Sequence, residues 1–139
     1  MRYFDASALV KRYVEEDRSA RVRELLKGDD RATSRFTEAE IASALARRNR
    51  EGLLDGAGRD RALDAMRKDR KAIHIVELSP EVVDLCIELI GRRALRSGDG
   101  VQLASCLHLR RSLEAEVHLV AYDDRLATAA RAEGLTVLT

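Results

Sequence analysis

The stretch Tyr3-Phe4-Asp5-Ala6-Ser7-Ala8-Leu9-Val10 decides the fold of this chain. Its two aromatic residues open a short strand, and the apolar residues that follow have the spacing of a helix over 6–14. A second helical pattern ends near Gly28, and glycine commonly follows the last residue of a helix. The stretch therefore predicts a strand that runs directly into helices, with Asp5 at the junction.

The same alternation of strands and helices continues to the last residue. Four further strands are predicted, at 32–34, 73–76, 117–121 and 135–138. Thr37 is the predicted N-cap of a helix that runs to Gly52, with Glu40 at the capping-box position. Because helices separate the strands, the crossovers should be right-handed and the sheet mainly parallel. We predict a three-layer α/β/α sandwich of about five strands, in one domain over residues 1–139.

The composition is that of a globular protein outside the membrane. Hydrophobic residues make up 45% of the chain and charged residues 35%, and the net charge is +1. No apolar run approaches the roughly 20 residues of a membrane helix, and the N-terminus has no leader pattern. Cys86 and Cys106 lie in apolar helical patterns, where a thiol behaves as a small hydrophobic group. We expect a cytoplasmic protein with no membrane contact.

Four acids are predicted to meet at one edge of the sheet. Asp5 follows the first strand, Asp123 follows the fourth, Asp99 opens a later helix, and Glu40 lies in the first turn of the helix after the second strand. Ligands gather at the carboxyl ends of parallel strands. Four close carboxylates repel one another unless a cation lies among them, and oxygen ligands favour Mg²⁺ or Mn²⁺.

Each acid has a simpler explanation when it is taken alone. Aspartate at a helix N-terminus stabilises the helix by about 1 kcal/mol as a cap, and a cap is more common than a metal ligand. Asp124 is a second acid beside Asp123 and is an alternative for the fourth position. The joint pattern of four acids in their sequence contexts favours a site.

Those contexts resemble the PIN-domain family over almost the whole chain. The first block, 3–13, is similar to the family's opening, in which Asp5 would bind metal and the Ser7 hydroxyl would support the acidic cluster. The second block, 34–40, has a glutamate three residues after a threonine, which assigns the role to Glu40. Glu38 would then be an outward-facing acid at the start of the helix.

The last two blocks resemble the family with one departure each. In the third block, 95–104, Asp99 opens a helix, but Gly100 stands where the family commonly has alanine, which would loosen the helix start. In the fourth block, 121–126, Ala121 replaces a common threonine. The resemblance assigns the fourth carboxylate to Asp123, with Asp124 kept as the alternative.

The resemblance implies a Mg²⁺- or Mn²⁺-dependent endoribonuclease, most like a VapC-type toxin of a type II toxin–antitoxin pair. Water activated by the metal would attack an RNA phosphodiester, and tRNA or another structured RNA suits the low aromatic content of 4%. An antitoxin protein would cover the acidic groove. A homodimer would form through exposed apolar parts of the early helices.

The basic side chains supply candidates for phosphate contacts. Arg96 precedes Asp99, while Arg12 and Arg48 lie on helices in the first half of the chain. For any single arginine, an ion pair on a solvated helix face is the simpler interpretation, and Arg96 is the strongest candidate. The three histidines lie in strand or helix patterns without ligand spacing and are interpreted as structural or exposed.

Two other functions are weighed against this one. A receiver-like or phosphatase-like Mg²⁺-dependent phosphohydrolase should have its acid pair after the first strand, whereas the pair Asp123-Asp124 follows the fourth. A PIN-like module that binds RNA or protein without catalysis would be expected to lose some of the four acids. Glycine-rich nucleotide-binding motifs are absent from the sequence.

Overall fold

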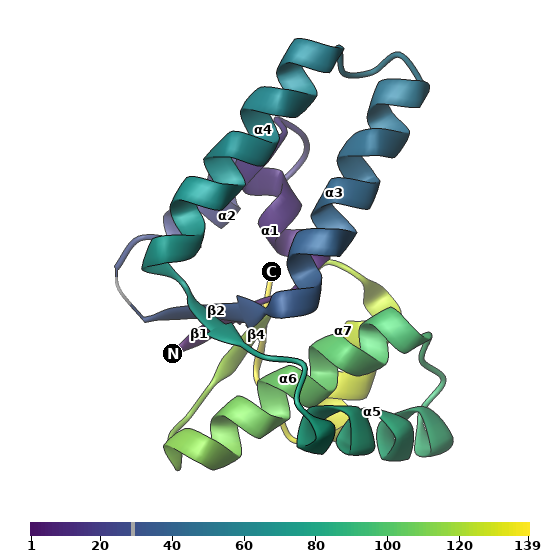
Figure 1. Ribbon diagram of the computed structural model, residues 1–139. Coiled ribbons are helices and arrows are strands. Elements are labelled where there is room, and N and C mark those ends of the chain that lie inside the picture. The colour runs from purple at the N-terminus through teal and green to yellow at the C-terminus, as the bar shows by residue number, and fades with distance from the viewer. Residues whose placement is uncertain (29) are drawn as a thin grey trace.

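The fold is built on one sheet of five parallel strands. The structure is a computed structural model that describes residues 1–28 and 30–139 (Figure 1). The strand order across the sheet is β3-β2-β1-β4-β5. The strands are β1 (Arg2–Phe4), β2 (Arg31–Ser34), β3 (His74–Val76), β4 (His118–Val120) and β5 (Val137–Leu138). The parallel register pairs Tyr3 with Ala32 on one side and with Leu119 on the other.

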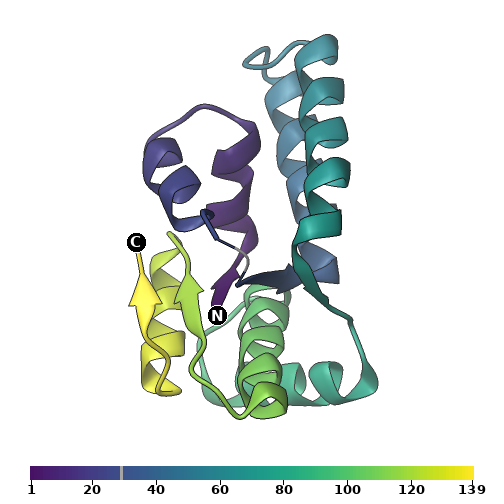
Figure 2. The same cartoon turned by 90° about the vertical axis from the view of Figure 1, so that its left-hand side faces the viewer.

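Helices cover both faces of the sheet. They are α1 (Ala6–Tyr13), α2 (Ser19–Leu25), α3 (Arg35–Arg50), α4 (Gly56–Asp69), the 3₁₀ turn η1 (Arg70–Ala72), α5 (Pro80–Arg92), α6 (Ser97–Leu113) and α7 (Asp124–Ala132). Figure 2 shows α1 to α4 on one side and α5 to α7 on the other, with α3 and α4 projecting as a long antiparallel pair. The predicted three-layer α/β/α fold with a parallel sheet is confirmed.

Alternating side chains of the central strands join the layers. Tyr3 and Leu119 are fully buried in the apolar cluster formed with α5, α6 and α7. Phe4 and Val120 belong to the cluster formed with α1 to α4. Because a strand points successive side chains to opposite faces, burial on both faces fixes the register of β1. The position of Asp5, directly after β1, is fixed with it.

The sheet has a switch point between β1 and β4. From β1 the chain passes to β2 and β3 on one side, and then crosses to β4 and β5 on the other. The helices that follow β1 and β4 therefore leave toward opposite faces (Figure 2). Open parallel sheets bind ligands in the crevice that this divergence creates at the carboxyl ends of the strands.

The start of α3 differs from the prediction. Its N-cap is Ser34, whose Oγ accepts a hydrogen bond from the Phe36 N–H at 3.2 Å. Thr37 is not the cap, because β2 runs into the helix without a loop and the last residue of the strand takes that position. Thr37 is instead buried and hydrogen-bonded to the Thr33 hydroxyl at 2.8 Å. Glu40 therefore lies in the second turn rather than the first, and it forms no capping box.

The large exposed apolar side chains of the described residues lie outside the first two helices. They are Leu53, Leu78, Val83, Ile87, Ile90 and Leu113. Val83, Ile87 and Ile90 share one face of α5, and Ile87 is the most exposed of these three at 65%. In the described ranges, α1 and α2 contribute no member to this set, so the exposed apolar surface that was predicted on the early helices is not found on these two, whereas α5 contributes three members. In the same ranges, no helix has the length and apolar character needed to span a bilayer.

Candidate active site

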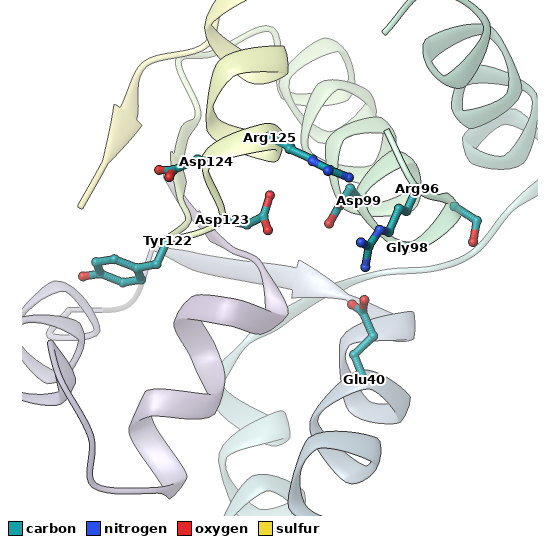
Figure 3. A pocket seen from close by; sticks show the side chains of 9 residues that line it. Glu40, Arg96, Gly98, Asp99, Tyr122, Asp123, Asp124 and Arg125 are labelled. Carbon is teal, nitrogen blue, oxygen red and sulfur yellow. The ribbon is translucent and has the colours of Figure 1, made fainter. Parts of the chain in front are cut away.

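A polar pocket of about 690 Å³ opens at the carboxyl edge of the sheet. Its walls come from α3, the start of α6 and the junction between β4 and α7. The lining residues are Glu40, Arg96, Ser97, Gly98, Asp99, Tyr122, Asp123, Asp124 and Arg125. Figure 3 shows the carboxylates of Glu40, Asp99 and Asp123 arranged around one space. Three of the four predicted acids therefore share this pocket.

Asp5, the fourth predicted acid, is buried beside the pocket with an exposed fraction of 3%. It is the N-cap of α1, and its Oδ1 accepts hydrogen bonds from Ser7 Oγ at 2.8 Å and from the Ala8 N–H at 2.9 Å. Among the described residues, no hydrogen bond reaches Oδ2. Burial, with a contribution from the charge of Glu40, raises the pKa of Asp5 to about 7, although the cap hydrogen bonds oppose the shift.

Ser7 links the N-cap of α1 to the junction between β4 and α7. Its Oγ donates to Asp5 Oδ1 and accepts a hydrogen bond from the Tyr122 N–H at 3.0 Å. The start of α1 is thereby held against the junction that carries Asp123. This geometry suits the supporting role that was predicted for Ser7.

Glu40 enters the pocket from α3, while Glu38 does not. The Oε2 atom of Glu40 accepts a hydrogen bond from Gln102 Nε2 at 2.5 Å. Burial and then the charge of Asp99 raise the pKa of Glu40, and the hydrogen bond from Gln102 works against them. Glu38 forms ion pairs with Arg35 and Arg70, both at 3.4 Å, outside the pocket.

Asp99 and Asp123 occupy the first turn of α6 and the N-cap of α7. The pKa of Asp99 is raised by burial and then by the charge of Asp123, and Arg96 and Arg125 partly oppose the shift. Asp123 Oδ1 accepts a hydrogen bond from the Leu126 N–H at 2.9 Å. Figure 3 shows Asp124 turned away from this group. The orientation favours Asp123 over Asp124 as the fourth carboxylate.

Capping alone does not explain this electrostatic pattern. A hydrogen bond to a carboxylate stabilises its ionised form and lowers its pKa. Here the pKa values of Asp5, Glu40 and Asp99 are all raised, and each of these acids is affected by the charge of another member of the cluster. Perturbed acids that gather in a cleft are typical of functional sites.

The donor chemistry of the cluster fits a hard divalent cation. Four carboxylates supply oxygen ligands of the kind that Mg²⁺ and Mn²⁺ prefer. As the side chains stand, no three acid, histidine or cysteine groups in ranges 1–28 and 30–139 are close enough to hold one ion. The side chains on the pocket wall would therefore have to close toward Asp5 when a cation binds.

The predicted arginines divide into two groups. Arg96 lines the pocket, and Arg125 lies across from it near Asp99 (Figure 3). Arg12 and Arg48 do not line it: Arg12 Nε lies 3.3 Å from Asp69 Oδ2, and Arg48 pairs with Glu16. Arg12 therefore faces α4 and Arg48 faces the connection between α1 and α2, both in their own layer. Sequence reasoning missed Arg125, although its position two residues after Asp123 was a usable signal.

Gly100, the departure in the third block, is explained by packing between α5 and α6. A Cβ atom at this position would lie 2.9 Å from both Cys86 Sγ and Ile90 Cγ1. Glycine lets α6 approach α5 closely while α6 still begins at Ser97. The structure therefore shows a local adaptation of the core at this position.

The fold and the pocket together define an α/β protein with an acidic site at the switch point of a parallel sheet. The family model for the PIN domain matches residues 2–132, and the chain belongs to the PIN-domain family. A curated relative, "Ribonuclease VapC47" of Mycobacterium tuberculosis (strain CDC 1551 / Oshkosh), is 32% identical, and the match covers 96% of this chain and 93% of the relative.

Solved structures share the fold at low sequence identity. VapC20 of Mycobacterium tuberculosis, described as a sarcin-ricin loop cleaving toxin, is 17% identical with a TM-score of 0.70, over 93% of this chain and 95% of that one. A toxin–antitoxin complex from Klebsiella pneumoniae matches with 15% identity and a TM-score of 0.70, over 100% and 97% of the two chains. Family membership sets aside the receiver-like and phosphatase-like alternatives.

Proposed function

We propose that this chain is a Mg²⁺- or Mn²⁺-dependent endoribonuclease and the toxin of a type II toxin–antitoxin pair. The observation that carries the proposal is a group of four carboxylates at the switch point, namely Asp5, Glu40, Asp99 and Asp123, that form no ion pair with any described residue. Membership of the PIN-domain family supports it. So does the 32% identity to a relative that is named as a ribonuclease.

The four carboxylates would hold the cation, and the remaining pocket residues would prepare the substrate. When bound, the cation would polarise the phosphodiester and lower the pKa of water. Ser7 keeps Asp5 in place, while Arg96 and Arg125 would bind phosphate oxygens and align the RNA backbone. Among the residues described in ranges 1–28 and 30–139, no histidine that could act as a general base lines the pocket.

The shape of the pocket bears on the class of RNA. Tyr122 is the aromatic residue in the lining, and Figure 3 shows its ring turned away from the carboxylates. Lys11 lies over that ring, with Nζ 5.2 Å from the ring centre. Because the described lining residues present no aromatic ring toward the acids, backbone contacts would dominate binding, which suits tRNA or another structured RNA better than a stacked single strand.

An antitoxin and a second copy of the chain complete the proposed assembly. The antitoxin would cover the acidic pocket, and this idea is supported by the similarity in fold to a toxin–antitoxin complex. The homodimer would use the apolar face of α5, where Val83, Ile87 and Ile90 are exposed. The proposed place of action is the cytoplasm.

The test is cleavage of purified total tRNA by the purified protein with Mn²⁺, with and without a chelator. We expect cleavage that the chelator abolishes and that Asp5→Asn lowers by about 100-fold or more, roughly 3 kcal/mol in activation free energy. Asp60→Asn on the exposed side of α4 is the matched control and should cleave as the wild type does. Equal cleavage by the wild type and Asp5→Asn would count decisively against the proposal.

A further inference from the structure

Gln102 is a polar side chain in the interior that the proposed chemistry does not use. It lies in α6 with an exposed fraction of 1%, next to the buried residues Leu103 and Ala104. A buried amide without hydrogen bonds costs several kcal/mol, so its partners determine whether it is tolerated. Gln102 therefore needs a structural or functional explanation.

Every polar atom of this amide has a partner. Tyr3 Oη donates to Gln102 Oε1 at 2.7 Å. Gln102 Nε2 donates to Thr37 Oγ1 at 2.8 Å and to Glu40 Oε2 at 2.5 Å. These bonds join β1, α3 and α6 below the pocket. The amide is satisfied, and one of its two N–H groups is directed at a proposed metal ligand.

The orientation of the amide follows from what its partners can do. An ionised Glu40 only accepts hydrogen bonds, so the nitrogen of Gln102 has to face it and the oxygen has to face Tyr3. Thr37 accepts from Gln102 and directs its own proton toward Thr33 Oγ1, which lies 2.8 Å away. Thr33 in turn donates to the Phe4 carbonyl at 2.6 Å. The hydrogen-bond network has one consistent arrangement, and it ends on Glu40.

Glu40 is also confined on its other side. A Cβ atom placed on Gly98 would lie 2.8 Å from Glu40 Oε1, so the backbone at Gly98 passes directly beside that oxygen. One carboxylate oxygen is thus held by Gln102, and the other lies against the pocket wall. The absence of a side chain at Gly98 leaves the room that Glu40 needs.

We propose that Gln102 is a positioning residue, which holds Glu40 in the carboxylate cluster in the orientation that a divalent cation requires. This inference rests on the proposed function. Repulsion from Asp99 and Asp5 favours a Glu40 side chain that swings toward solvent, and the hydrogen bond from Gln102 opposes that movement. Outer partners of metal ligands typically contribute about 10- to 100-fold in metal affinity.

The test compares Mn²⁺ binding, read from the electron paramagnetic resonance signal of free Mn²⁺, in folded variants of the full chain. Gln102→Met keeps the length of the side chain and removes the donor, so we expect binding about 10- to 100-fold weaker than in the wild type. Gln102→Glu keeps the acceptor for Tyr3 and places a carboxylate against Glu40, and it should weaken binding at least as much. Circular dichroism and thermal unfolding check the fold of each variant.

Two further variants separate positioning from loss of stability. Ser19→Ala removes a buried hydroxyl that bonds the Val14 carbonyl in the other layer, at a residue that does not line the pocket, and should bind Mn²⁺ as the wild type does. Tyr3→Phe removes the donor that fixes the amide but leaves Gln102 able to reach Glu40. It should weaken binding by an intermediate factor, about 3-fold.

The outcomes distinguish this inference from the proposed function. If the wild type binds no Mn²⁺, or Asp5→Asn binds as tightly as the wild type, the metal-dependent function fails. If Asp5→Asn loses binding while folded Gln102→Met keeps it, only the role of Gln102 is overturned. Equal losses of Mn²⁺ affinity in Gln102→Met and Ser19→Ala also overturn the role of Gln102. If Gln102→Met does not fold, unchanged Mn²⁺ binding by Tyr3→Phe overturns that role instead.

Discussion

The pocket at the sheet edge and the layer formed by α1 to α4 handle charge in opposite ways. In the layer, acids and bases pair: Lys11 lies 3.0 Å from Glu16, and Arg12 lies 3.3 Å from Asp69. In the described part of the chain, no ion pair within 4.0 Å includes an acid of the cluster or either pocket arginine. Charges of both signs are abundant in both regions.

This difference separates charge that supports the fold from charge that is held for a ligand. Paired charges on helices contribute little each, roughly 0 to 1 kcal/mol when exposed, and they need nothing further. Unpaired acids that gather at partly buried positions destabilise the free protein, and a bound cation would offset that cost. The comparison predicts that substitutions in the two regions affect different properties.

The largest effect is expected from the fourth carboxylate. Asp123→Asn keeps a side chain that can cap α7 but loses the charge, so RNA cleavage should fall by about 100-fold or more. Asp124→Asn is the matched control, because its side chain points away from the cluster, and it should change the rate less than about 3-fold. Initial rates at saturating Mn²⁺ give the comparison. The reverse order would assign the role to Asp124.

The next effect is on stability and depends on pH through Asp5. Its pKa is about 7 in the folded chain against 3.8 as the ordinary value, so between these pH values the folded chain holds a proton that the unfolded chain has released. The free energy of unfolding therefore falls as the pH rises from about 4 to about 7. Asp5→Asn removes this contribution and should melt roughly 5 °C or more above the metal-free wild type at pH 8.

The difference between these melting temperatures should shrink as the pH falls to 4 and below, because Asp5 is mostly protonated in both states of the wild type only under its ordinary pKa of 3.8. The pKa values of Glu40 and Asp99 are also raised. The melting temperature of the variant should therefore still fall with rising pH, but less steeply than that of the wild type. Thermal unfolding across this range, in buffer with a chelator, measures the effect. Parallel curves for the two proteins would show that Asp5 does not titrate in this window.

Substituting an arginine should affect RNA cleavage in the pocket and stability in the layer of α1 to α4. Arg96→Met should lower cleavage by about 10-fold, near 1.4 kcal/mol, and leave the melting temperature unchanged. Arg48→Met should do the reverse, because it leaves the half-buried Glu16 with one cation instead of two, at a cost of about 1 kcal/mol in unfolding free energy. Matched cleavage and melting data on both variants test this, and a cleavage defect confined to Arg48→Met would reverse the assignment.

The smallest effects come from two glycines in the first turns of α6. Gly98→Ala would push on the movable end of Glu40, so we expect metal affinity to fall several-fold with little change in stability. Gly100→Ala would push on the buried Cys86 and on Ile90 of α5, so stability should fall by roughly 1 kcal/mol while metal affinity is kept. Mn²⁺ titration and chemical denaturation distinguish the two results. Identical profiles would mean that the start of α6 behaves as one unit.

Local sequence patterns were sufficient to predict the layers of the fold and which acids would lie at the candidate site. Asp5 directly follows β1 and Asp123 comes shortly after β4, so their positions depend mainly on strand order, and both lie at the carboxyl edge of the parallel sheet. The N-cap of α3 was misassigned because Ser34 and Thr37 are both good caps, and sequence does not show where β2 ends. Because of that error, Glu40 was predicted one helical turn closer to the start of α3 than it lies in the structure.

The roles of the arginines could not be read from the sequence, because any arginine on a helix can pair or remain free. Arg12 and Arg48 pair because Asp69 and Glu16 come from other parts of the chain, and Arg125 faces Asp99 because α6 and α7 meet. Gln102 gave no signal, since an amide inside an apolar helical pattern has no meaning until its partners are known.

By itself, the sequence determined the alternation of strands and helices, the parallel sheet and the acids at its carboxyl edge. Hydrophobic periodicity and chain order are local properties, and they are sufficient for these features. The tertiary structure alone decided which charges are paired, which acid of the pair 123–124 faces the cluster, and which interior amide holds Glu40. Those outcomes depend on distances between residues far apart in the chain, and only packing of the layers sets such distances.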